Sequence, residues 1–117
     1  MATPANFRLV IDEKFFYLSL QFPDNLKRLA DVKSLHDVTL EASDGLHMTA
    51  NKSVLAARSL FFEKVFEENP FKENVLFLCL DGLELTQMTR LIYGLEIQVK
   101  KTRLEKVLDN KNFLGIH

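Results

Sequence analysis

Cysteine, tryptophan, glycine and proline are scarce in this chain of 117 residues, which contains one cysteine, no tryptophan, four glycines and three prolines. A single thiol, Cys79, excludes a disulfide framework and a zinc site built from several cysteines, and it suits a reducing compartment. Because glycine and proline are few and no internal repeat is present, we expect one domain without a long linker.

An excess of either charge is also missing. The 15 basic and 16 acidic side chains leave a net charge of -1, whereas a domain that neutralises nucleic-acid phosphates is normally strongly basic. The basic cluster between Lys100 and Lys106 could contact phosphates, but Glu96 and Glu105 dilute it and no aromatic side chains interleave it. We therefore interpret the cluster as a solvated helix face and expect no direct nucleic-acid partner.

Long hydrophobic runs are absent as well. The longest one, Val75 to Leu80, is far shorter than the roughly 20 residues that cross a bilayer, and the N-terminus lacks the charged and apolar regions of a signal peptide. We therefore expect an intracellular domain with no membrane partner. What the chain does have is a 47% share of apolar residues, including ten phenylalanines, which is enough for a hydrophobic core.

The patterns of apolar residues predict several strands. The run 15–20 is apolar at almost every position and predicts a strand buried on both faces, and Val75 to Leu80 predicts a second, central strand. Strict alternation on both sides of the Asp-Gly pair at 44–45 predicts a β-hairpin. We expect residues 1–14 to form a flexible segment ahead of one domain over 15–117.

Helix signals occupy the remaining segments. Asn51 and Ser59 are suited to cap two short helices, and Thr102 with Glu105 forms the pattern of a capping box that would open the last helix. That helix is expected to end or fray at Asp109–Asn112, where four polar residues follow one another. The chain therefore predicts a mixed α+β domain with more helix than strand.

Residues for catalysis or metal binding are hard to find. The three histidines are scattered and fit no metal-binding motif, and each glycine is isolated, so no phosphate-binding loop is present. Cys79 lies within an apolar run and is expected to be an inert core thiol, and His47 is expected to face solvent. We predict no catalytic residue, no cofactor, no metal and no small-molecule substrate, and hence a protein that is not an enzyme.

The strand predicted at 15–20 offers more apolar surface than a small domain can easily cover. Such a strand promotes aggregation when it is exposed. We therefore expect a partner chain to cover it, most simply an identical chain in a two-fold dimer. Packing of the strand within its own subunit is the alternative.

Two linked motifs resemble the BTB/POZ family. Residues 37–40 (Asp-Val-Thr-Leu) match a strand of that family, and residues 50–62 match its Ala-His-Lys, Leu-Ala-Ala and Ser-x-x-Phe pattern, with Asn51 in place of the His. Leu91–Ile97 resembles the later Tyr-Thr-Gly-Glu segment without its Thr, and Phe113–Ile116 resembles the closing Leu-Leu-x-Ile. The resemblance covers nearly the whole predicted domain.

The N-terminal part resembles the tramtrack/bric-a-brac type of BTB domain, which is found on transcription factors. Residues 16–22, followed by Asn-Leu at 25–26, are similar to the opening Phe-x-Leu-x-Trp-Asn and the later Asn-Leu of that type, although Leu20 replaces the Trp. Glu-Asn-Pro at 68–70 stands where this subgroup carries Glu/Asp-Asn-Pro.

The resemblance implies a BTB/POZ fold, in which a helical cluster flanks a short mixed sheet and the N-terminal strand is exchanged in a dimer. It implies a protein–protein interaction module that forms homodimers, or hetero- or higher oligomers, and acts in transcription or chromatin regulation. The expected partners are a second copy, other BTB proteins and chromatin regulators, in the nucleus or, as the alternative, the cytoplasm. A chain of this length is expected to supply dimerisation and to rely on a partner for targeting.

The resemblance also implies which residues meet at the dimer interface. The first strand would cross to the partner, and the first helices would pack across the two-fold axis. Asp37 and Lys52 match a buried Asp and a buried Lys or Arg that line a charged pocket there. The expected interface residues are Phe15, Phe16, Tyr17, Leu18, Leu20, Leu26, Leu29, Asp37 and Lys52.

A second function is compatible with the same family. Some members are adaptors for cullin-based ubiquitin ligases and carry an apolar-x-Glu motif after the third helix, and Phe-Lys-Glu at 71–73 fits that motif. Phe71 and Glu73 would then contact the cullin. Packing of Phe71 onto its own subunit is the alternative interpretation.

Overall fold

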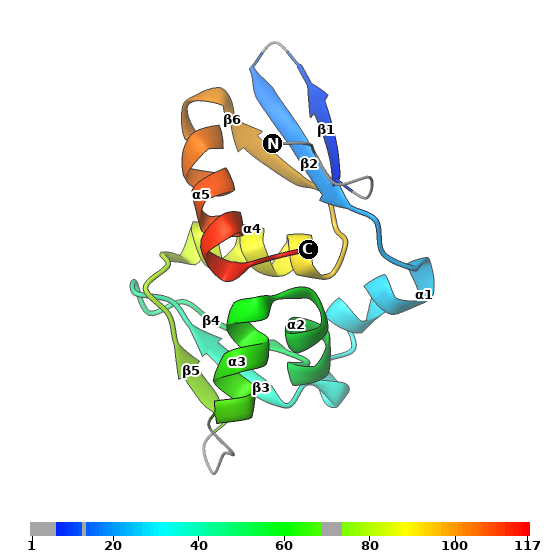
Figure 1. Ribbon diagram of the computed structural model, residues 1–117, viewed down its shortest axis with the longest axis vertical. Helices are drawn as coiled ribbons and strands as arrows, with labels where there is room; N and C mark the ends of the chain where they lie inside the picture. The colour runs from blue at the N-terminus through cyan, green and yellow to red at the C-terminus, as the bar shows by residue number, and fades with distance from the viewer. Residues whose placement is uncertain (1–6, 13, 69–73) are drawn as a thin grey trace.

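Two small sheets lie at opposite ends of the molecule, with helices between them and over one face of the lower sheet (Figure 1). The computed structural model describes residues 7–12, 14–68 and 74–117. The extents along the three principal axes are 46, 31 and 27 Å. The mixed α+β class expected from the sequence is confirmed.

The upper sheet consists of three antiparallel strands: β1 (Phe7–Ile11), β2 (Phe15–Leu20) and β6 (Ile97–Lys100). β2 is the central strand, so the N-terminal and C-terminal parts of the chain meet in this sheet. The expected strand at 15–20 is therefore present. Its burial is uneven, because Leu18 and Leu20 point into the core while the other four side chains are half-buried.

The segment 7–11 differs from the expectation of a flexible N-terminus. It forms β1, with Phe7 opposite Leu20 and Ile11 opposite Phe16. The sequence Phe-Arg-Leu-Val-Ile has high strand propensity, and β2 offers an unpaired edge to which it can hydrogen-bond. The boundary of the ordered domain therefore lies earlier than residue 15.

The lower sheet contains β3 (Val38–Glu41), β4 (His47–Ala50) and β5 (Val75–Phe77) in the order β4-β3-β5. β3 and β4 form the predicted antiparallel hairpin, with Val38 opposite Ala50. Gly45 adopts a left-handed φ of +91° in the turn, which favours glycine at that position.

The prediction of a central buried strand at Val75 to Leu80 is wrong. β5 contains three residues and lies at the edge of its sheet, where β3, in parallel, is its only partner among the described strands. Phe77 is 71% exposed, whereas Leu78 and Leu80 pack into the core after the strand has ended. Cys79 between them is exposed, so the expectation of a core thiol is also wrong. An unbroken apolar run does not say which side chains point inward once the chain leaves the sheet.

The core lies around α4, whose side chains Leu85, Met88, Leu91 and Ile92 are almost inaccessible to solvent. Among the described residues the other helices and helical turns are shorter or more exposed. The helices are α1 (Asp24–Lys27), α2 (Lys52–Arg58), α3 (Leu60–Glu68), α4 (Gly82–Ile92) and α5 (Leu104–Leu114), and the 3-10 turns are η1 (Arg28–Ala30), η2 (Lys33–Leu35) and η3 (Lys101–Arg103).

The predicted helix caps are only partly correct. Ser59 Oγ accepts a hydrogen bond from the Phe62 amide, as expected for a cap of α3. Asn51 occupies the position before α2, but its side chain does not cap that helix. The strongest cap is on α4, where the carboxylates of Asp81 and Glu84 each accept a hydrogen bond from the other residue's amide.

Two expectations about α5 are wrong. Thr102 forms no capping box, because the chain passes through η3 and α5 begins only at Leu104 with no side-chain cap. The helix also continues through Asp109–Asn112 to Leu114. The polar stretch stays helical because Asn110 is buried and its Nδ2 donates to Glu84 Oε2 at 2.8 Å.

Candidate interaction surface

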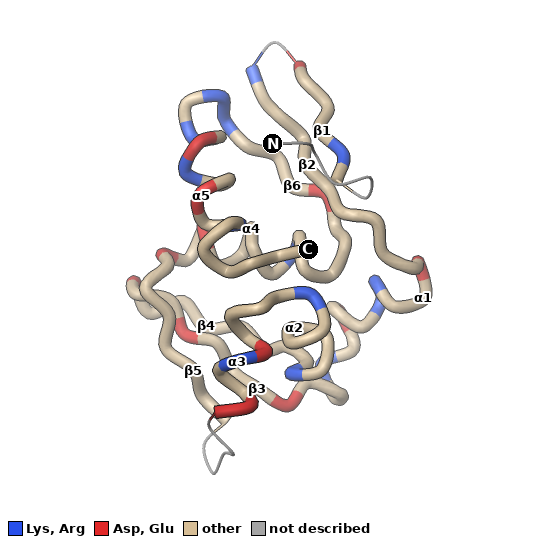
Figure 2. Tube along the Cα trace, viewed as in Figure 1, with Lys and Arg blue, Asp and Glu red and all other residues tan. Residues whose placement is uncertain are grey.

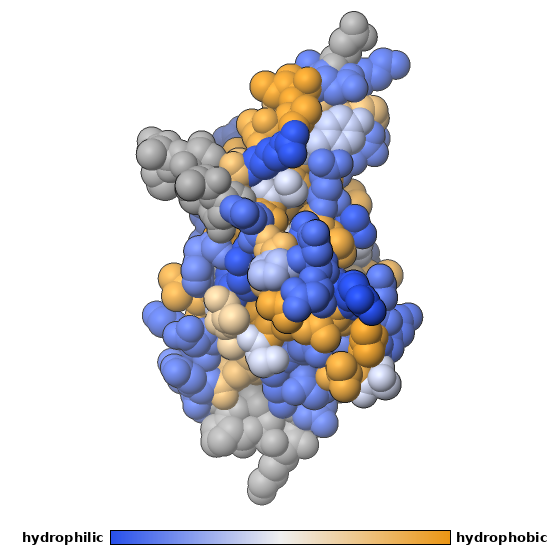
Figure 3. Space-filling model, turned by 90° about the vertical axis from the view of Figure 1, so that its right-hand side faces the viewer, coloured by the Kyte–Doolittle hydropathy of each residue, from blue (hydrophilic) through white to orange (hydrophobic). Residues whose placement is uncertain are grey.

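Hydrophobic side chains remain exposed on the side of the molecule that carries α1. Figure 3 shows this side, with hydrophobic surface in an upper region, where β1 and β2 lie, and in a lower region. A small soluble domain rarely exposes contiguous apolar surface unless a partner covers it. The exposed large apolar side chains of β1 and of the segment 26–35 are Leu9, Val10, Ile11, Leu26, Val32 and Leu35.

The segment 26–35 is exposed because its helical turns are short. Pro23 immediately precedes α1, which has only four residues, none of them buried. Leu29 is half-buried and packs against the core, whereas Leu26 is 39% exposed and Leu35 is 59% exposed. Of the two residues expected in the dimer interface here, only Leu26 is among the exposed large apolar side chains of a single chain.

β2 is packed within its own subunit in this structure. Tyr17 lies opposite Gln98 of β6, and its hydroxyl accepts a hydrogen bond from Gln98 Nε2 at 3.2 Å. Leu18 lies opposite Ile97, and both are buried. The packing that the sequence left as the alternative is therefore the one seen in a single chain.

Asp37 and Lys52 lie close together, as expected, but their closest contact is not an ion pair between side chains. Asp37 Oδ1 accepts a hydrogen bond of 2.7 Å from the Lys52 amide, and so caps α2 in place of Asn51. Lys52 Nζ donates to Asn74 Oδ1 at 3.3 Å and lies 5.9 Å from the centre of the Phe66 ring. Asp37 is exposed in a single chain.

Tyr93 is buried and contacts Asn51, the residue that precedes Lys52. Its hydroxyl donates to Asn51 Oδ1 at 2.6 Å and accepts from the Asn51 amide at 2.8 Å. Burial raises the pKa of Tyr93, the Asn51 amide opposes that rise, and the negative charge of Asp37 adds to it. Sequence reasoning did not identify this role, since nothing in the local pattern links two residues so far apart.

Arg58 is a further residue that the sequence did not single out. Its guanidinium lies 4.9 Å from the centre of the Phe22 ring, and its Nη2 donates to the carbonyl of Gln21 at 3.2 Å. Its Nε is buried and has no hydrogen-bond partner within the described residues, and burial lowers the pKa of the group. Arg58 therefore holds the connection between β2 and α1.

The basic cluster at 100–106 spans the end of β6, the turn η3 and the start of α5 (Figure 2). Lys100, Lys101 and Arg103 are exposed, and Lys106 Nζ is 3.9 Å from Glu84 Oε2. This exposure agrees with the interpretation as a solvated face. The described residues contain no group of three His, Cys, Asp or Glu side chains suited to a metal ion, and no helix among them could cross a membrane.

The proposed cullin contact cannot be placed in the structure. Phe71 and Glu73 lie outside the described residues. His47 is exposed, as expected, and its Nε2 is 3.1 Å from Glu41 Oε1.

Comparisons with known proteins agree with this fold. The BTB domain of zebrafish PATZ1 superimposes with a TM-score of 0.60 at 20% sequence identity, over 84% of this chain and 88% of that one. The Drosophila melanogaster "Longitudinals lacking protein-like" is 32% identical over 110 residues, which are 90% of this chain and 86% of the relative. The model of the BTB/POZ domain matches residues 26–117. The chain belongs to the BTB/POZ domain family.

Proposed function

We propose that this chain is a self-associating protein-interaction module, a homodimer that acts in transcription or chromatin regulation. The BTB/POZ domain is a protein-interaction fold. The observation that carries the proposal is the apolar surface left open on β1 and on the segment 26–35 of one subunit. A two-fold axis beside this surface would bury the same patch of both copies.

Exchange of the N-terminal hairpin is the arrangement we favour for the dimer. The segment 21–23 joins β2 to α1 and contains no residue of either sheet or helix. If this segment extends, β1 and β2 can leave their own β6 and pair with β6 of the second copy through the same hydrogen bonds. Such an exchange costs little, because the pairing and packing that the hairpin leaves in its own chain form again in the second copy.

The nuclear role rests on sequence resemblance. The opening 16–22 is similar to the tramtrack/bric-a-brac type of BTB domain on transcription factors. Other BTB proteins and chromatin regulators are therefore the partners we propose. Affinity purification from nuclear extract tests this role: recovery of chromatin proteins supports it, and their absence from repeated purifications contradicts it.

A disulfide between β2 and β6 tests the exchange of the hairpin directly. In a Cys79→Ser background, Tyr17→Cys and Gln98→Cys place two thiols on directly opposed residues, close enough for a disulfide. With exchange, oxidation gives a covalent dimer on a non-reducing gel. Without exchange, the same bond closes within one chain and the band stays monomeric.

The hairpin itself supplies a matched control. Arg8 and Ser19 are opposed within the β1–β2 hairpin, which stays in one chain in both arrangements. Arg8→Cys with Ser19→Cys therefore gives a monomeric band in either case. Light scattering on the unmodified protein measures self-association separately, and a monomeric mass at about 100 µM would contradict the proposal of a dimer.

A further inference from the structure

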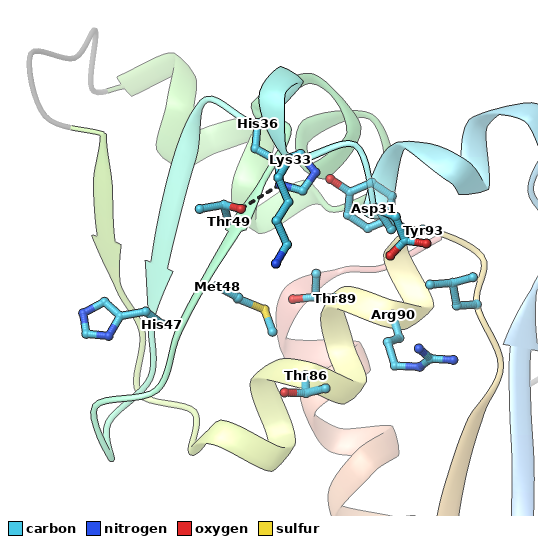
Figure 4. Close-up of a pocket in the computed structure, with 12 residues that line it drawn as sticks. Asp31, Lys33, His36, His47, Met48, Thr49, Thr86, Thr89, Arg90 and Tyr93 are labelled. Carbon is cyan, nitrogen blue, oxygen red and sulfur yellow. Dashed lines mark hydrogen bonds between the residues drawn. The ribbon is translucent and has the colours of Figure 1, made fainter.

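A cavity of about 440 Å³ runs along the free edge of β4. Its walls come from β4, from the outward side of α4 and from the segment 30–36, as Figure 4 shows. This volume is within the range of ligand sites in proteins, roughly 300–1,000 Å³. The lining side chains that bear on a ligand are Asp31, Lys33, His36, Met48, Thr86 and Arg90.

The backbone of β4 offers hydrogen bonds to this cavity. Among the described strands, β4 has β3 as its only neighbour. The Ala42 amide donates to the Leu46 carbonyl across the hairpin, and alternation along an antiparallel ladder then turns the amides and carbonyls of His47 and Thr49 away from β3. The edge therefore presents two donors and two acceptors to an incoming strand.

The side chains around the cavity are apolar at its base and basic at its rim. Met48 and Lys33 both point into it in Figure 4, whereas His47 points away. Lys33 is exposed, while Arg90 uses Nε and Nη2 to bind the Glu96 carbonyl at 3.2 and 2.9 Å, which leaves Nη1. Asp31 is the single acidic residue of the lining.

The neighbouring polar groups are mostly engaged, so they do not offset this basic character. His36 Nδ1 lies 2.7 Å from Thr49 Oγ1, and its Nε2 lies 2.8 Å from the Leu29 carbonyl. Thr86 Oγ1 donates to the Gly82 carbonyl at 2.7 Å, so it can only act as an acceptor of a further hydrogen bond. Lys33 and Arg90 together therefore outnumber Asp31, and the charged groups of the lining are on balance basic.

We propose that the free edge of β4 and this cavity bind an extended, acidic peptide segment of a partner protein. The segment adds to the lower sheet as a fourth strand beside β4. Its backbone pairs with His47 and Thr49, alternate side chains enter the apolar base beside Met48, and carboxylates lie near Lys33 and Arg90. Main-chain bonds supply affinity in such strand addition, and the pockets for alternate side chains supply specificity.

This site is separate from the β1–β2 hairpin that we propose is exchanged, although its wall at 30–36 overlaps the segment 26–35 of the proposed dimer surface. The upper sheet carries the hairpin, whereas β4 belongs to the lower sheet. A peptide on β4 therefore leaves β2 and β6 free to pair within or between chains. The inference would stand even if the chain proved to be monomeric.

A labelled peptide, Ac-TVEVEVES-NH2, is the probe. We expect it to bind the whole chain with a dissociation constant below about 100 µM in fluorescence anisotropy. Amide chemical shifts should change at His47 and Thr49 and on α4, and not along β5. The matched peptide Ac-TVKVKVKS-NH2 should bind at least about tenfold more weakly, because it meets Lys33 and Arg90 with like charge.

Two variants separate the backbone contribution from the charge contribution. His47→Pro removes an outward amide at the first residue of an edge strand, a position where proline is tolerated. Lys33→Glu reverses the charge that points into the cavity. Each should weaken binding of the acidic peptide by about tenfold or more, while Lys64→Glu on α3 should not change it.

Circular dichroism and the melting temperature of each variant establish that it is folded. Three results would each overturn the proposal. The two peptides could bind equally well, the acidic peptide could bind folded His47→Pro and Lys33→Glu as it binds the unmodified chain, or it could fail to bind at 1 mM. If light scattering shows instead that His47→Pro abolishes association of the chain with itself, then a second copy occupies this edge and the acidic-peptide assignment is wrong.

Discussion

The hydroxyl of Tyr93, at the end of α4, makes two hydrogen bonds to Asn51, which lies before α2, 42 positions earlier in the chain. Asn51 Nδ2 also donates to the Leu35 carbonyl at 3.1 Å. The buried residue Asn51 therefore connects α4, α2 and the segment 26–35, which carries the exposed apolar residues. These hydrogen bonds hold the segment 26–35, part of the surface proposed for self-association, against the core.

Tyr93→Phe should destabilise the fold by about 1–3 kcal/mol, because the amide and the side-chain oxygen of Asn51 lose their partner away from water. Urea unfolding measures this change. Tyr17→Phe is the control, since its hydroxyl bond to Gln98 is exposed, and should cost less than about 0.5 kcal/mol. If both variants lower the unfolding free energy equally, the buried hydroxyl of Tyr93 stabilises the fold no more than the exposed hydroxyl of Tyr17.

Acid should weaken the fold through Glu84. Burial by itself raises the pKa of this carboxyl, but hydrogen bonds from Asn110 and the Asp81 amide, with the charges of Lys106 and Arg103, outweigh it and lower the pKa below its ordinary value of 4.5. The charged form is therefore favoured in the folded state. Its contribution is present above pH 4.5 and is lost as the pH falls through the lower folded-state pKa.

The pH dependence of urea unfolding checks this sign. In Glu84→Gln the decrease in unfolding free energy between pH 5 and pH 3 should be smaller than in the unmodified chain. Glu105→Gln, on the exposed side of α5, is the control and should leave that decrease as it is. A steeper loss in Glu84→Gln would mean that the carboxylate destabilises the folded state.

The bend after α4 should tolerate no side chain at Gly94. This residue has a left-handed φ of +76°, and an added Cβ would overlap Cβ of Phe22. Gly45 has φ +91° with open space around it, so a side chain there costs only the strain of a left-handed backbone and meets no neighbouring atom. Thermal and urea unfolding should give a cost of about 1–2 kcal/mol for Gly45→Ala and clearly more for Gly94→Ala. Similar costs would show that Phe22 can move aside.

Local sequence was sufficient for some features that span only a few residues, but not for the caps expected from Asn51 and Thr102. The hairpin around Gly45 and the cap of Ser59 on α3 both follow from short-range rules. The family resemblance then placed these pieces in one fold.

Contacts between distant segments explain what the sequence did not predict. Asp109–Asn112 stays helical because Asn110 finds Glu84 on another helix, and Asp37 replaces Asn51 as the cap of α2. Val75 to Leu80 has the composition of a central strand, but the sheet ends at β5. Propensity and periodicity carry no information about which neighbour an element will meet.

The charge of Asp37 should matter for self-association more than for folding. Asp37→Asn keeps an oxygen that can accept from the Lys52 amide, so unfolding of the single chain should change by less than about 0.5 kcal/mol. If the partner buries this side chain beside Lys52, the same variant should weaken the dimer in light scattering. Glu41→Gln removes one charge at the far end of β3 and serves as the control. Equal, small effects on association would place Asp37 outside the interface.

The apolar side chains of the segment 26–35 should be needed for dimerisation. Leu35 is 59% exposed in one chain, so Leu35→Glu should leave the fold intact. The variant should raise the dissociation constant of the dimer by at least about tenfold, because a charge would have to be buried against the partner. Phe77, on β5 of the lower sheet, is 71% exposed. Phe77→Glu should leave the dimer unchanged. Light scattering over a dilution series measures both. Loss of the dimer in Phe77→Glu but not in Leu35→Glu would move the interface to the edge of the lower sheet.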